Sequence, residues 1–460
     1  MKRIFLSLII VLVLIVSNCY SWPYVDSRSV ILQNKAGYEI DNNNPLSTSP
    51  ADNAGIDAFC RQRVSNPETI FDSKNIYRNT NIPTDNENQP LYYDNQETSG
   101  SGTATEYKPN ESTTYLYVSD STAGTRVRQT KQRFNYQPGK SVMVFMSFCF
   151  IDQTEGISKR EGLFDEKNGL FFEDTGATYN LVVRSYTTGV TVDNKVAQED
   201  WNIDPLDGTG KSGITADFTK AQILIMDYEW LGVGRVRMGF VIDGCIYYVH
   251  EFLHANNITT TYMQTPNLPL RSEIENDGTG SASSMTQICS TVISEGGQNK
   301  LGTVRSANTG GTHIDLTAEN TRYAVLGIRL KEEYIGETIE IIRTEMQIHT
   351  ATDRVLWEVL YSPEVSGTFT YNDICCSAIQ YAVGSTSNTV SGNYILDSGF
   401  LESGGSAVGR SGSSSEKLEN GLKLGSFIDG TVETIVLCAT PIGGSTAVDV
   451  EGSITWRELN

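Results

Sequence analysis

Residues 230–265 read WLGVGRVRMGFVIDGCIYYVHEFLHANNITTTYMQT. From Val236 to Ile242 apolar side chains alternate with polar or small ones, which is the period of a half-buried strand. Asp243-Gly244 is the residue pair of a type I′ turn, and Cys245 to Phe252 is β-branched and aromatic, as expected of a returning strand. The stretch therefore predicts a β-hairpin. A two-residue turn sets its register, which pairs Ile242 with Cys245, Phe240 with Tyr247 and Arg237 with His250.

The returning strand contains His250-Glu-Phe-Leu-His254, the spacing found in zinc metalloproteases. That chemistry needs a helix, in which residues i and i+4 reach one Zn²⁺ from the same face. In a strand, His250 and His254 share a face but lie roughly 13 Å apart, and Glu251 points to the opposite face. The hairpin therefore predicts that these two histidines bind no metal.

The chain of 460 residues carries a net charge of -20, from 55 acidic against 35 basic residues. This balance weighs against nucleic acid as a partner, because sequence-independent binding needs a basic surface. It also disfavours anionic membrane surfaces. The excess of acid favours solubility and mutual repulsion at a crowded surface.

The N-terminus has the features of a targeting segment. Lys2 and Arg3 precede an apolar run from Ile4 to Val16, and small residues precede Trp22. We expect residues 1–21 to be a signal peptide, or an N-terminal anchor if uncleaved, and the run is short for a bilayer span. Either outcome places the rest of the chain in the secretory pathway or outside the cell, with membrane contact only through this segment.

Two sequons, at Asn110 and Asn257, are candidate glycosylation sites and are compatible with secretory passage in a eukaryotic cell. The eight cysteines contain no CxxC spacing, so zinc ribbons and thioredoxin-type redox sites are not supported. No cofactor is indicated.

Composition and hydrophobic pattern along the chain predict three regions after the targeting segment. Residues 22–125 are rich in Asn, Asp, Ser, Thr and Gly and predict an extended polar arm, with one apolar island that includes Phe59 and Phe71. Residues 126–349 show strand periods and turn signals, and predict a β-sandwich domain. Residues 350–460 form a C-terminal β region, which either stands alone or closes the same sandwich. The fold class expected is all-β, a jelly-roll or concanavalin-like sandwich.

Two other motifs resemble ligand-binding loops, but the residues around them predict ordinary turns. Asp207 to Ser212 ends in the Gly-Lys-Ser of a phosphate loop, but the full pattern needs Gly where Pro205 stands, so a turn-rich loop is expected. Acidic stretches at Asp204–Asp207 and Glu275–Asp277 do not fit a calcium loop and predict solvated turns.

Catalytic signals are sparse. No Gly-x-Ser-x-Gly elbow is present, and His250, His254, His313 and His349 have no visible partners. A carboxylate pair suited to glycoside hydrolysis stays open, because such pairing is spatial. The five Trp (Trp22, Trp201, Trp230, Trp357, Trp456) and 22 Tyr suggest either a sugar-stacking platform or core packing, and core packing is favoured in a sandwich.

Several distinctive blocks carry a resemblance to a known family. They are DAFCRQRVSNP (57–67), RFNYQPGK (133–140), DPLDGTG (204–210), WLGVGRVR (230–237), GFVIDG (239–244), YMQTPNLPLR (262–271) and ICSTVISEGG (288–297). Over about residues 55–460 the chain resembles virion-associated structural proteins of tailed phages, notably marine ones, and of giant DNA viruses. A weaker likeness, in Phe240 to Val249, is to concanavalin or laminin-G sandwiches.

The resemblance implies a structural protein without established catalytic residues, so no site is carried over. The targeting segment departs from the phage members and points to a virus of a eukaryotic cell or a cell-encoded relative. We therefore expect a non-enzymatic virion surface protein, as a fibre, decoration or host-attachment component. The alternatives are a secreted carbohydrate-binding (lectin-like) protein and, third, a secreted hydrolase. Expected partners are other virion proteins or copies of itself, and host surface glycans.

Overall fold

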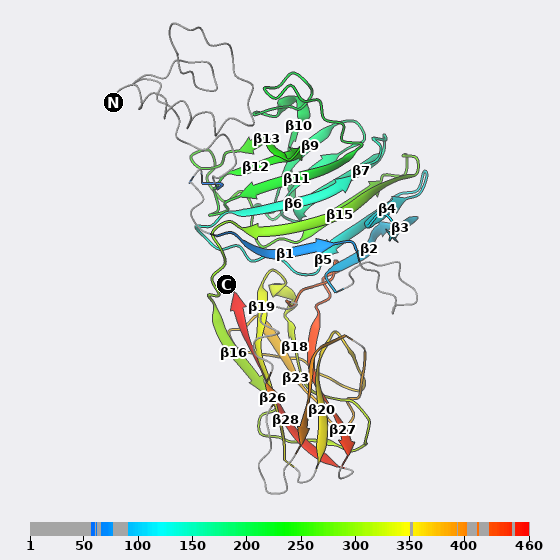
Figure 1. Ribbon diagram of the computed structural model, residues 1–460, viewed down its shortest axis with the longest axis vertical. Helices are drawn as coiled ribbons and strands as arrows, with labels where there is room; N and C mark the ends of the chain where they lie inside the picture. The colour runs from blue at the N-terminus through cyan, green and yellow to red at the C-terminus, as the bar shows by residue number, and fades with distance from the viewer. Residues whose placement is uncertain are drawn as a thin grey trace, which may run out of the picture. The chain divides into compact units, whose positions relative to one another are not determined.

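The computed structural model describes residues 57–59, 61, 66–76, 91–349, 353–392, 394–402, 412–413, 423–443 and 447–459. These residues form two β-sandwiches (Figure 1). The described ranges contain no α-helix, only the 3-10 turns η1 (Gln198–Asp200) and η2 (Glu332–Tyr334). None of their helices is long and apolar enough to cross a membrane. The predicted all-β sandwich class is confirmed; the targeting segment, residues 1–21, lies outside the described residues.

The first sandwich packs an eight-stranded against a seven-stranded antiparallel sheet. The order in the eight-stranded sheet is β13 (Cys245–Phe252), β12 (Val236–Ile242), β11 (Ala221–Tyr228), β6 (Val142–Cys149), β15 (Ser283–Ser294), β4 (Thr113–Val118) and β3 (Thr103–Lys108), and β1 (Glu68–Lys74) also pairs with β15. The order in the seven-stranded sheet is β10 (Val192–Ala197), β9 (Tyr179–Ser185), β8 (Gly169–Asp174), β7 (Ile157–Phe164), β14 (Leu270–Asn276), β5 (Gly124–Thr130) and β2 (Tyr93–Gly100).

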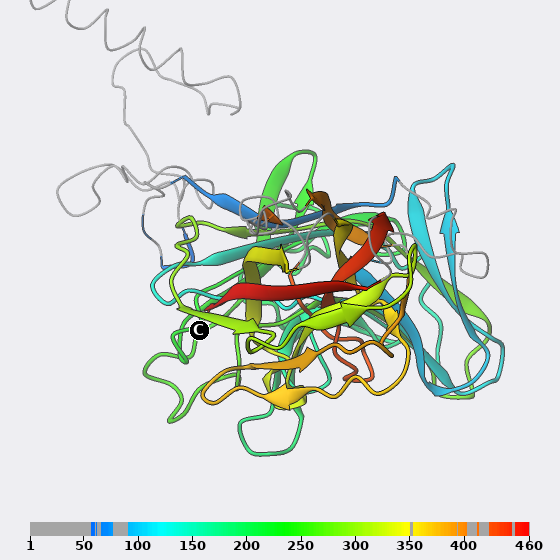
Figure 2. The ribbon, with the colours of Figure 1, turned by 90° about the horizontal axis from the view of Figure 1, so that it is seen from below.

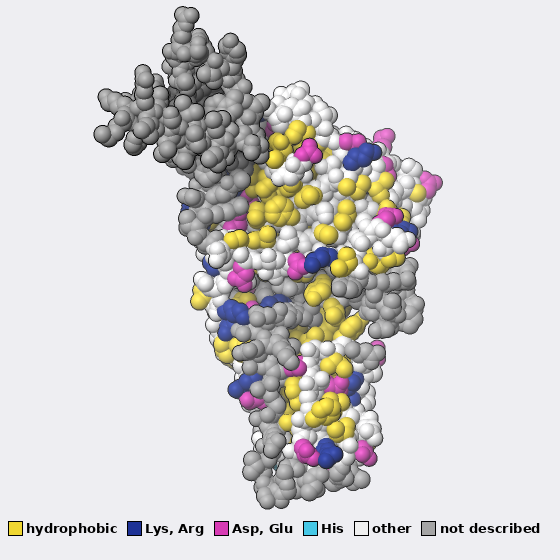
Figure 3. Space-filling model, in the orientation of Figure 1, with side chains coloured by type: hydrophobic (Ala, Val, Ile, Leu, Met, Phe, Trp, Pro, Cys, Tyr) yellow, Lys and Arg dark blue, Asp and Glu magenta, His cyan; other side chains and the backbone are white. Residues whose placement is uncertain are grey.

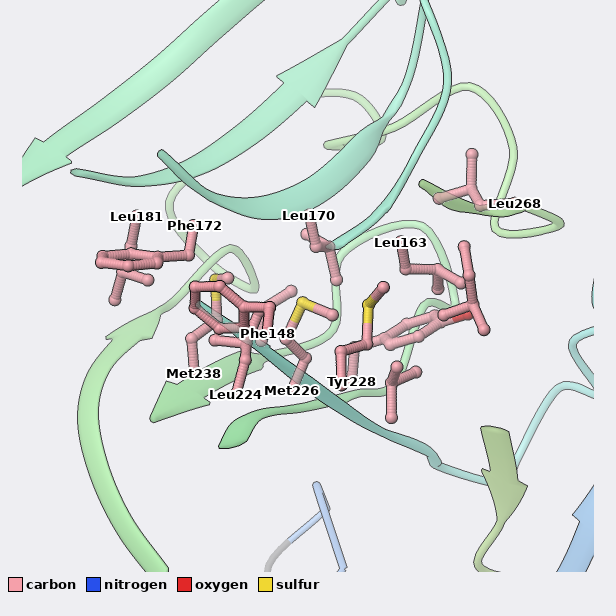
Figure 4. Close-up of a cluster of buried hydrophobic side chains, with 14 of the residues drawn as sticks. Phe148, Leu163, Leu170, Phe172, Leu181, Leu224, Met226, Tyr228, Met238 and Leu268 are labelled. Carbon is pink, nitrogen blue, oxygen red and sulfur yellow. The ribbon is translucent and has the colours of Figure 1, made fainter. Parts of the chain in front are cut away.

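Alternation along the strands builds the core between these two sheets. On β6 the inward side chains Val144, Met146 and Phe148 are buried, whereas Phe145 lies on the outer face. Phe172 of the facing sheet packs near Phe148, with ring centroids 6.1 Å apart, in the apolar cluster of Figure 4. Each such side chain contributes roughly 1.5–3 kcal/mol when fully buried. The period-2 pattern seen in the sequence is therefore the pattern of the core.

The β12–β13 hairpin has the predicted turn but not the whole predicted register. Ile242 pairs with Cys245 and Phe240 with Tyr247, as expected, and Asp243 takes the positive φ of 51° that a type I′ turn requires. A β-bulge then shifts the pairing, so that His250 lies opposite Met238 and Arg237 opposite Glu251. The expected Arg237–His250 pair was wrong, because one extra residue, Val249, is accommodated on the returning strand.

The second sandwich is formed entirely by residues after 302. One sheet contains β16 (Thr303–Asn308), β28 (Val448–Leu459), β19 (Thr338–Ile348) and β26 (Gly412–Ser413), with β17 (Ile314–Leu316) also paired to β28. The other contains β22 (Asn372–Asp373), β23 (Ile379–Val383), β18 (Tyr323–Leu330), β27 (Thr434–Gly443), β20 (Arg354–Tyr361) and β25 (Ile395–Glu402). A two-stranded ribbon joins β21 (Glu364–Val365) and β24 (Val390–Ser391). Figure 2 shows these strands, coloured from lime to red, from below.

The structure divides the chain differently from the expected domain limits. The strands over residues 303–348 pair with the C-terminal β28, so the second sandwich begins near 303, not 350. Residues 93–125, expected within the polar arm over 22–125, form strands of the first sandwich. Their apolar side chains are sparse because only one face of each strand meets the core, as Leu116 and Val118 do. The arm's earlier part is described only at 57–59, 61, 66–76 and 91–92, where Phe71 of the apolar island is buried on β1.

Candidate functional site

The outer face of the eight-stranded sheet carries an apolar area that we call the central patch. It consists of Met143, Phe145, Ile225, Ile246, Tyr248 and Ile293, together with the Asp227–Arg237 ion pair. Figure 3 shows this face, on which hydrophobic side chains gather over the β11–β13 region. Outward faces of antiparallel sheets are ordinarily polar. The central patch is therefore more apolar than the outward face of an ordinary antiparallel sheet.

Asp227, Arg237 and Tyr248 form the polar centre of this patch. Asp227 on β11 lies opposite Arg237 on β12, and the Arg237 Nε donates to Asp227 Oδ1 at 2.8 Å. Their side chains are 0% and 3% exposed. The Tyr248 hydroxyl donates to the second carboxylate oxygen of Asp227, and the Arg237 guanidinium lies 4.3 Å from the Tyr248 ring centroid. Both oxygens of the carboxylate thus accept hydrogen bonds from other side chains of the patch.

The electrostatics of this trio follow from burial and charge. Burial lowers the pKa of Arg237, but the hydrogen bond and charge of Asp227 more than offset it, so its pKa is raised. Burial, reinforced by the Asp227 charge, raises the pKa of Tyr248. At neutral pH the trio is therefore an ion pair capped by a neutral phenol. Its net charge is zero.

Gly239 makes room for this arrangement. It lies opposite Tyr248 on the neighbouring strand, and the Tyr248 hydroxyl must pass over β12 to reach Asp227 on β11. A Cβ at Gly239 would lie 2.2 Å from the Tyr247 carbonyl oxygen, which no real side chain tolerates. The absence of a side chain here lets an aromatic ring cover the strand, which is a known use of glycine in sheets.

Aliphatic side chains complete the patch. Ile225 is fully buried and Met143 is 8% exposed, although both point outward. Half-buried Phe145, Ile246 and Ile293 pack around them. These side chains offer apolar area with almost no hydrogen-bonding capacity. The accessible part of the patch is therefore formed by the partly exposed Phe145, Ile246 and Ile293 over a buried base of Ile225, Met143 and Tyr248.

The outer face of the other sheet carries an ion-pair network and a small buried apolar cluster of Phe164, Phe171 and Val182. Arg160 on β7 reaches three carboxylates, Glu173 and Glu275 at 2.9 Å each and Glu273 at shorter range. Burial raises the pKa of Glu273, but the charges of Arg271 and Arg160 more than offset it and lower that pKa to about 2. Apolar side chains therefore occur on both outer faces of the sandwich, and on this one they lie beside the ion-pair network.

A second feature of the outer face, which we call the tyrosine edge, lies on β3 and β4. Tyr115 and Tyr117 are half-buried and stack with ring centroids 5.6 Å apart at an interplanar angle of 17°. The Tyr115 hydroxyl donates to Glu111 at 2.9 Å, and the Tyr117 hydroxyl donates to Glu106 at 3.2 Å. Lys108 pairs with the same Glu106 at 2.5 Å. Two adjacent aromatic faces are thus bordered by charged hydrogen-bonding groups.

Sequence reasoning did not single out Tyr115 and Tyr117. The signal was available in Thr113-Thr-Tyr-Leu-Tyr-Val118, since a strand with this alternation places both tyrosines on one face. The polar composition of the flanking residues, which predicts an extended arm, outweighs this short alternation.

The two histidines of the protease-like motif serve the fold. The His250 Nδ1 accepts the backbone N–H of Asn202 at 3.1 Å. The His254 Nδ1 lies 2.7 Å from the Gly234 carbonyl oxygen, and its ring stacks on Tyr262 at 4.1 Å. Burial lowers the pKa of His250 to about 4 and also lowers that of His254. Both histidines are therefore neutral and engaged with neighbouring chain segments at pH 7.

The loop with the phosphate-loop-like ending is organised by two carboxylates, those of Asp204 and Asp207. Asp204 accepts the backbone N–H of Leu206 at 3.0 Å and that of Ser212 at 2.7 Å. Asp207 accepts the backbone N–H and the hydroxyl of Thr209. The expected turn-rich loop is confirmed, and its acidic oxygens are used by backbone donors. At the other acidic stretch, Asp277 accepts from Thr279 in the same way.

The tryptophans considered for a sugar-stacking platform lie mostly in the core, whereas the two candidate glycosylation sites lie on the surface. Trp201, Trp357 and Trp456 are buried, and the half-buried Trp230 donates its indole N–H to Met263, so these tryptophans form no platform. Trp22 lies outside the described residues. The sequon asparagines Asn110 and Asn257 are both in exposed turns, as glycosylation requires.

Together the sheets define a protein of two antiparallel β-sandwiches, with the central patch and the tyrosine edge on the first. No protein-family model matches the chain, and no curated protein matches it. Among solved structures, the chain is similar to a glycoside hydrolase family protein from Mycobacterium thermorestibile, with 11% identity over 48% of this chain and 99% of that one and a TM-score of 0.33.

The chain is also similar to the carbohydrate recognition domain of Emp47p, with 10% identity over 50% of this chain and 97% of that one and a TM-score of 0.29. A third similar structure is the legume lectin-like domain from Entamoeba histolytica, with 10% identity over 44% of this chain and 89% of that one and a TM-score of 0.25. Likeness at this level concerns the sandwich fold only. The virion-protein resemblance receives no support from these comparisons and stays a prediction.

Proposed function

We propose that the protein is a non-enzymatic surface structural protein, displayed on a virion as a fibre, decoration or host-attachment component. In this proposal the central patch docks on another structural protein of the same surface. The observation that carries it is the apolar, charge-neutral area on the outer face of the eight-stranded sheet. The resemblance of the sequence to virion-associated proteins suggests the setting.

The chemistry of the patch favours a protein partner over a sugar. Sugar recognition needs hydrogen-bonding groups that match ring hydroxyls, whereas Met143, Ile225 and Ile293 provide none. The polar groups that are present, Asp227 and Arg237, already satisfy each other. Aliphatic side chains around a neutral centre resemble the core of a protein–protein interface, from which unpaired charge is depleted.

The non-enzymatic part of the proposal rests on how the candidate catalytic groups are used. Asp227 is held by Arg237 and Tyr248, and His250 and His254 by backbone groups. A general acid or base must be free to exchange a proton with a substrate. Each of these groups is instead committed to a structural contact.

Mass spectrometry of purified particles tests the setting, and a patch variant tests the docking. We expect the chain in particles, and we expect Phe145→Arg to reduce its incorporation at least tenfold while secretion and folding persist. The matched control is Val190→Arg, which changes a 65% exposed apolar side chain outside the patch. Absence of the chain from particles, together with free secretion, contradicts the virion assignment. Equal incorporation of both variants contradicts the role of the patch.

The tyrosine edge favours a second candidate function, binding of host surface glycans. Tyr115 and Tyr117 offer two adjacent aromatic faces, and Glu106, Lys108 and Glu111 border them. Sugar rings stack on such faces while their hydroxyls bond to flanking charged groups. A glycan array with the wild type, the Tyr115→Ala/Tyr117→Ala double variant and the control Tyr334→Ala tests it. Tyr334 is 43% exposed on the second sandwich. Binding lost only in the double variant supports the function, and binding that survives it contradicts it.

A further inference from the structure

Three potential metal ligands meet on the outer face of the second sandwich. His313 immediately precedes β17, Glu451 lies on β28, and His349 immediately follows β19. β28 pairs with β17 on one side, where Ile314 lies opposite Val450, and with β19 on the other, where Gln347 lies opposite Glu451. The two histidines therefore flank one carboxylate from neighbouring strands.

The distances bring their donor atoms together. His313 Nδ1 lies 3.2 Å from Glu451 Oε1, and His349 Nε2 lies 2.8 Å from Glu451 Oε2. The two imidazole ring centroids are 4.4 Å apart. One donor atom from each residue lies within 4.8 Å of the other two. Within the described ranges, this is the one group of three or more His, Cys, Asp or Glu side chains with such spacing.

We propose that His313, His349 and Glu451 bind a divalent transition-metal ion, with Zn²⁺ as the preferred occupant. Two imidazoles and one carboxylate suit zinc and its neighbours, whereas Ca²⁺ and Mg²⁺ prefer all-oxygen ligands. Bonds of about 2.0–2.2 Å in a tetrahedron separate ligand atoms by roughly 3.3–3.5 Å. Of the two nitrogen–oxygen distances, that of His313 (3.2 Å) lies near this value and that of His349 (2.8 Å) is shorter. Rotation of an exposed imidazole closes the widest separation.

The surroundings favour a cation. Asp315 and Asp449 lie opposite each other, one step along the same face from the His313–Glu451 position. Oδ1 of Asp315 is buried and has no hydrogen-bond partner among the described residues. These two carboxylates add negative potential beside the site, which strengthens the attraction for a positive ion.

The placement also gives the ion a structural consequence. β17 has three residues and, among the described strands of its sheet, pairs with β28 alone. An ion held by His313, Glu451 and His349 would cross-link this short strand to both β28 and β19. Glu451 also lines a pocket of about 290 Å³ with Asn308, Thr309 and Glu345. A three-ligand site leaves a fourth coordination position for water or a small ligand, and the Glu451 side of the site borders this pocket.

Isothermal titration of the untagged, metal-free full chain with Zn²⁺ tests the site. We expect one Zn²⁺ per chain, with affinity reduced at least about tenfold in each of His313→Gln, His349→Gln and Glu451→Gln. The matched control is Glu345→Gln, which lines the same pocket but is outside the ligand group and should bind as the wild type does.

Thermal unfolding separates metal binding from simple ion pairing. Zn²⁺ should raise the Tm of the wild type and the control but not of the three ligand variants, since a ligand that binds only the native state stabilises it. Without metal the variants should fold as the wild type does, because both histidines are exposed. Absence of zinc binding, or binding unchanged by all three ligand substitutions, overturns the proposal.

Discussion

His250 lies opposite Met238 on the β12–β13 hairpin, and its Nδ1 accepts the N–H of Asn202 at 3.1 Å. The β-bulge that creates this pairing turns His250 toward the 201–204 loop, and the next residue, Glu251, pairs with Arg235 on the other side at 3.3 Å. An imidazole buried as an acceptor must remain neutral. This relationship makes the first sandwich sensitive to acid.

We expect stability to fall as the pH drops below neutral because of His250. Its pKa is lowered to about 4 in the folded chain, against 6.5 when unfolded. Between these values only the unfolded chain takes up the proton, so its contribution is full above pH 6.5 and is lost as pH falls through 4. The loss amounts to roughly 3 kcal/mol. Urea unfolding at pH 7.5 and 4.5 measures it. His250→Asn, which keeps an acceptor but does not titrate, should show a smaller drop; an equal drop would assign the effect elsewhere.

Removing one partner of the central ion pair should be costly. Asp227→Asn leaves the buried Arg237 guanidinium without its counter-charge, and loss of one partner of a buried pair costs about 3–5 kcal/mol. The control is Glu402→Gln, whose pair with Arg354 is 63% exposed on both sides and contributes at most about 1 kcal/mol. Chemical denaturation compares the two. Equal, small losses in the free energy of unfolding would show that the Asp227–Arg237 pair does not stabilise the fold.

Gly239→Ala should destabilise the first sandwich by roughly 1–3 kcal/mol, since overpacking shifts backbone and side chains. The new methyl group would meet the Tyr247 carbonyl oxygen and displace Tyr248 from Asp227. Gly336→Ala is the matched control, because a Cβ there meets nothing within 4 Å. Thermal melts of both variants decide the point. A neutral Gly239→Ala would mean that the hairpin relaxes freely.

Zinc bound by the chain should not depend on the protease-like motif. His254 is engaged with Gly234 and Tyr262, so His254→Ala should leave the zinc content by elemental analysis unchanged. The same substitution removes a ring stack and should lower the Tm. Stoichiometric zinc that disappears in His254→Ala would show the hairpin interpretation to be wrong.

Both sequons should be occupied when the chain passes through a eukaryotic secretory pathway. Asn110 and Asn257 lie in exposed turns that a glycosyltransferase can reach. Enzymatic removal of N-glycans should shift the mass of the wild type, and Asn110→Gln and Asn257→Gln should each abolish part of the shift. An unshifted wild type would contradict secretory passage.

Local pattern in the sequence determined the strands and turns. The alternation in Val142–Phe148, the run from Ala221 to Tyr228 and the Asp243-Gly244 turn appear in the structure as β6, β11 and the β12–β13 hairpin. Such features depend on neighbours in the chain, because side-chain period and turn dihedrals are local properties. The loop organised by Asp204 was predictable for the same reason.

Tertiary structure alone decided which strands meet. Residues 93–118 are mostly polar, with few apolar side chains. Only their pairing with β5 and β15 shows that they belong to the first sandwich. The same holds for β28, which reaches back to β16, β17 and β19 and so sets the second sandwich apart. Long-range pairing also places His313 and His349 beside Glu451, and Tyr248 across Gly239 onto Asp227. These contacts join residues far apart in the chain, and their free energy comes from burial and hydrogen bonds that exist only once the sheets have formed.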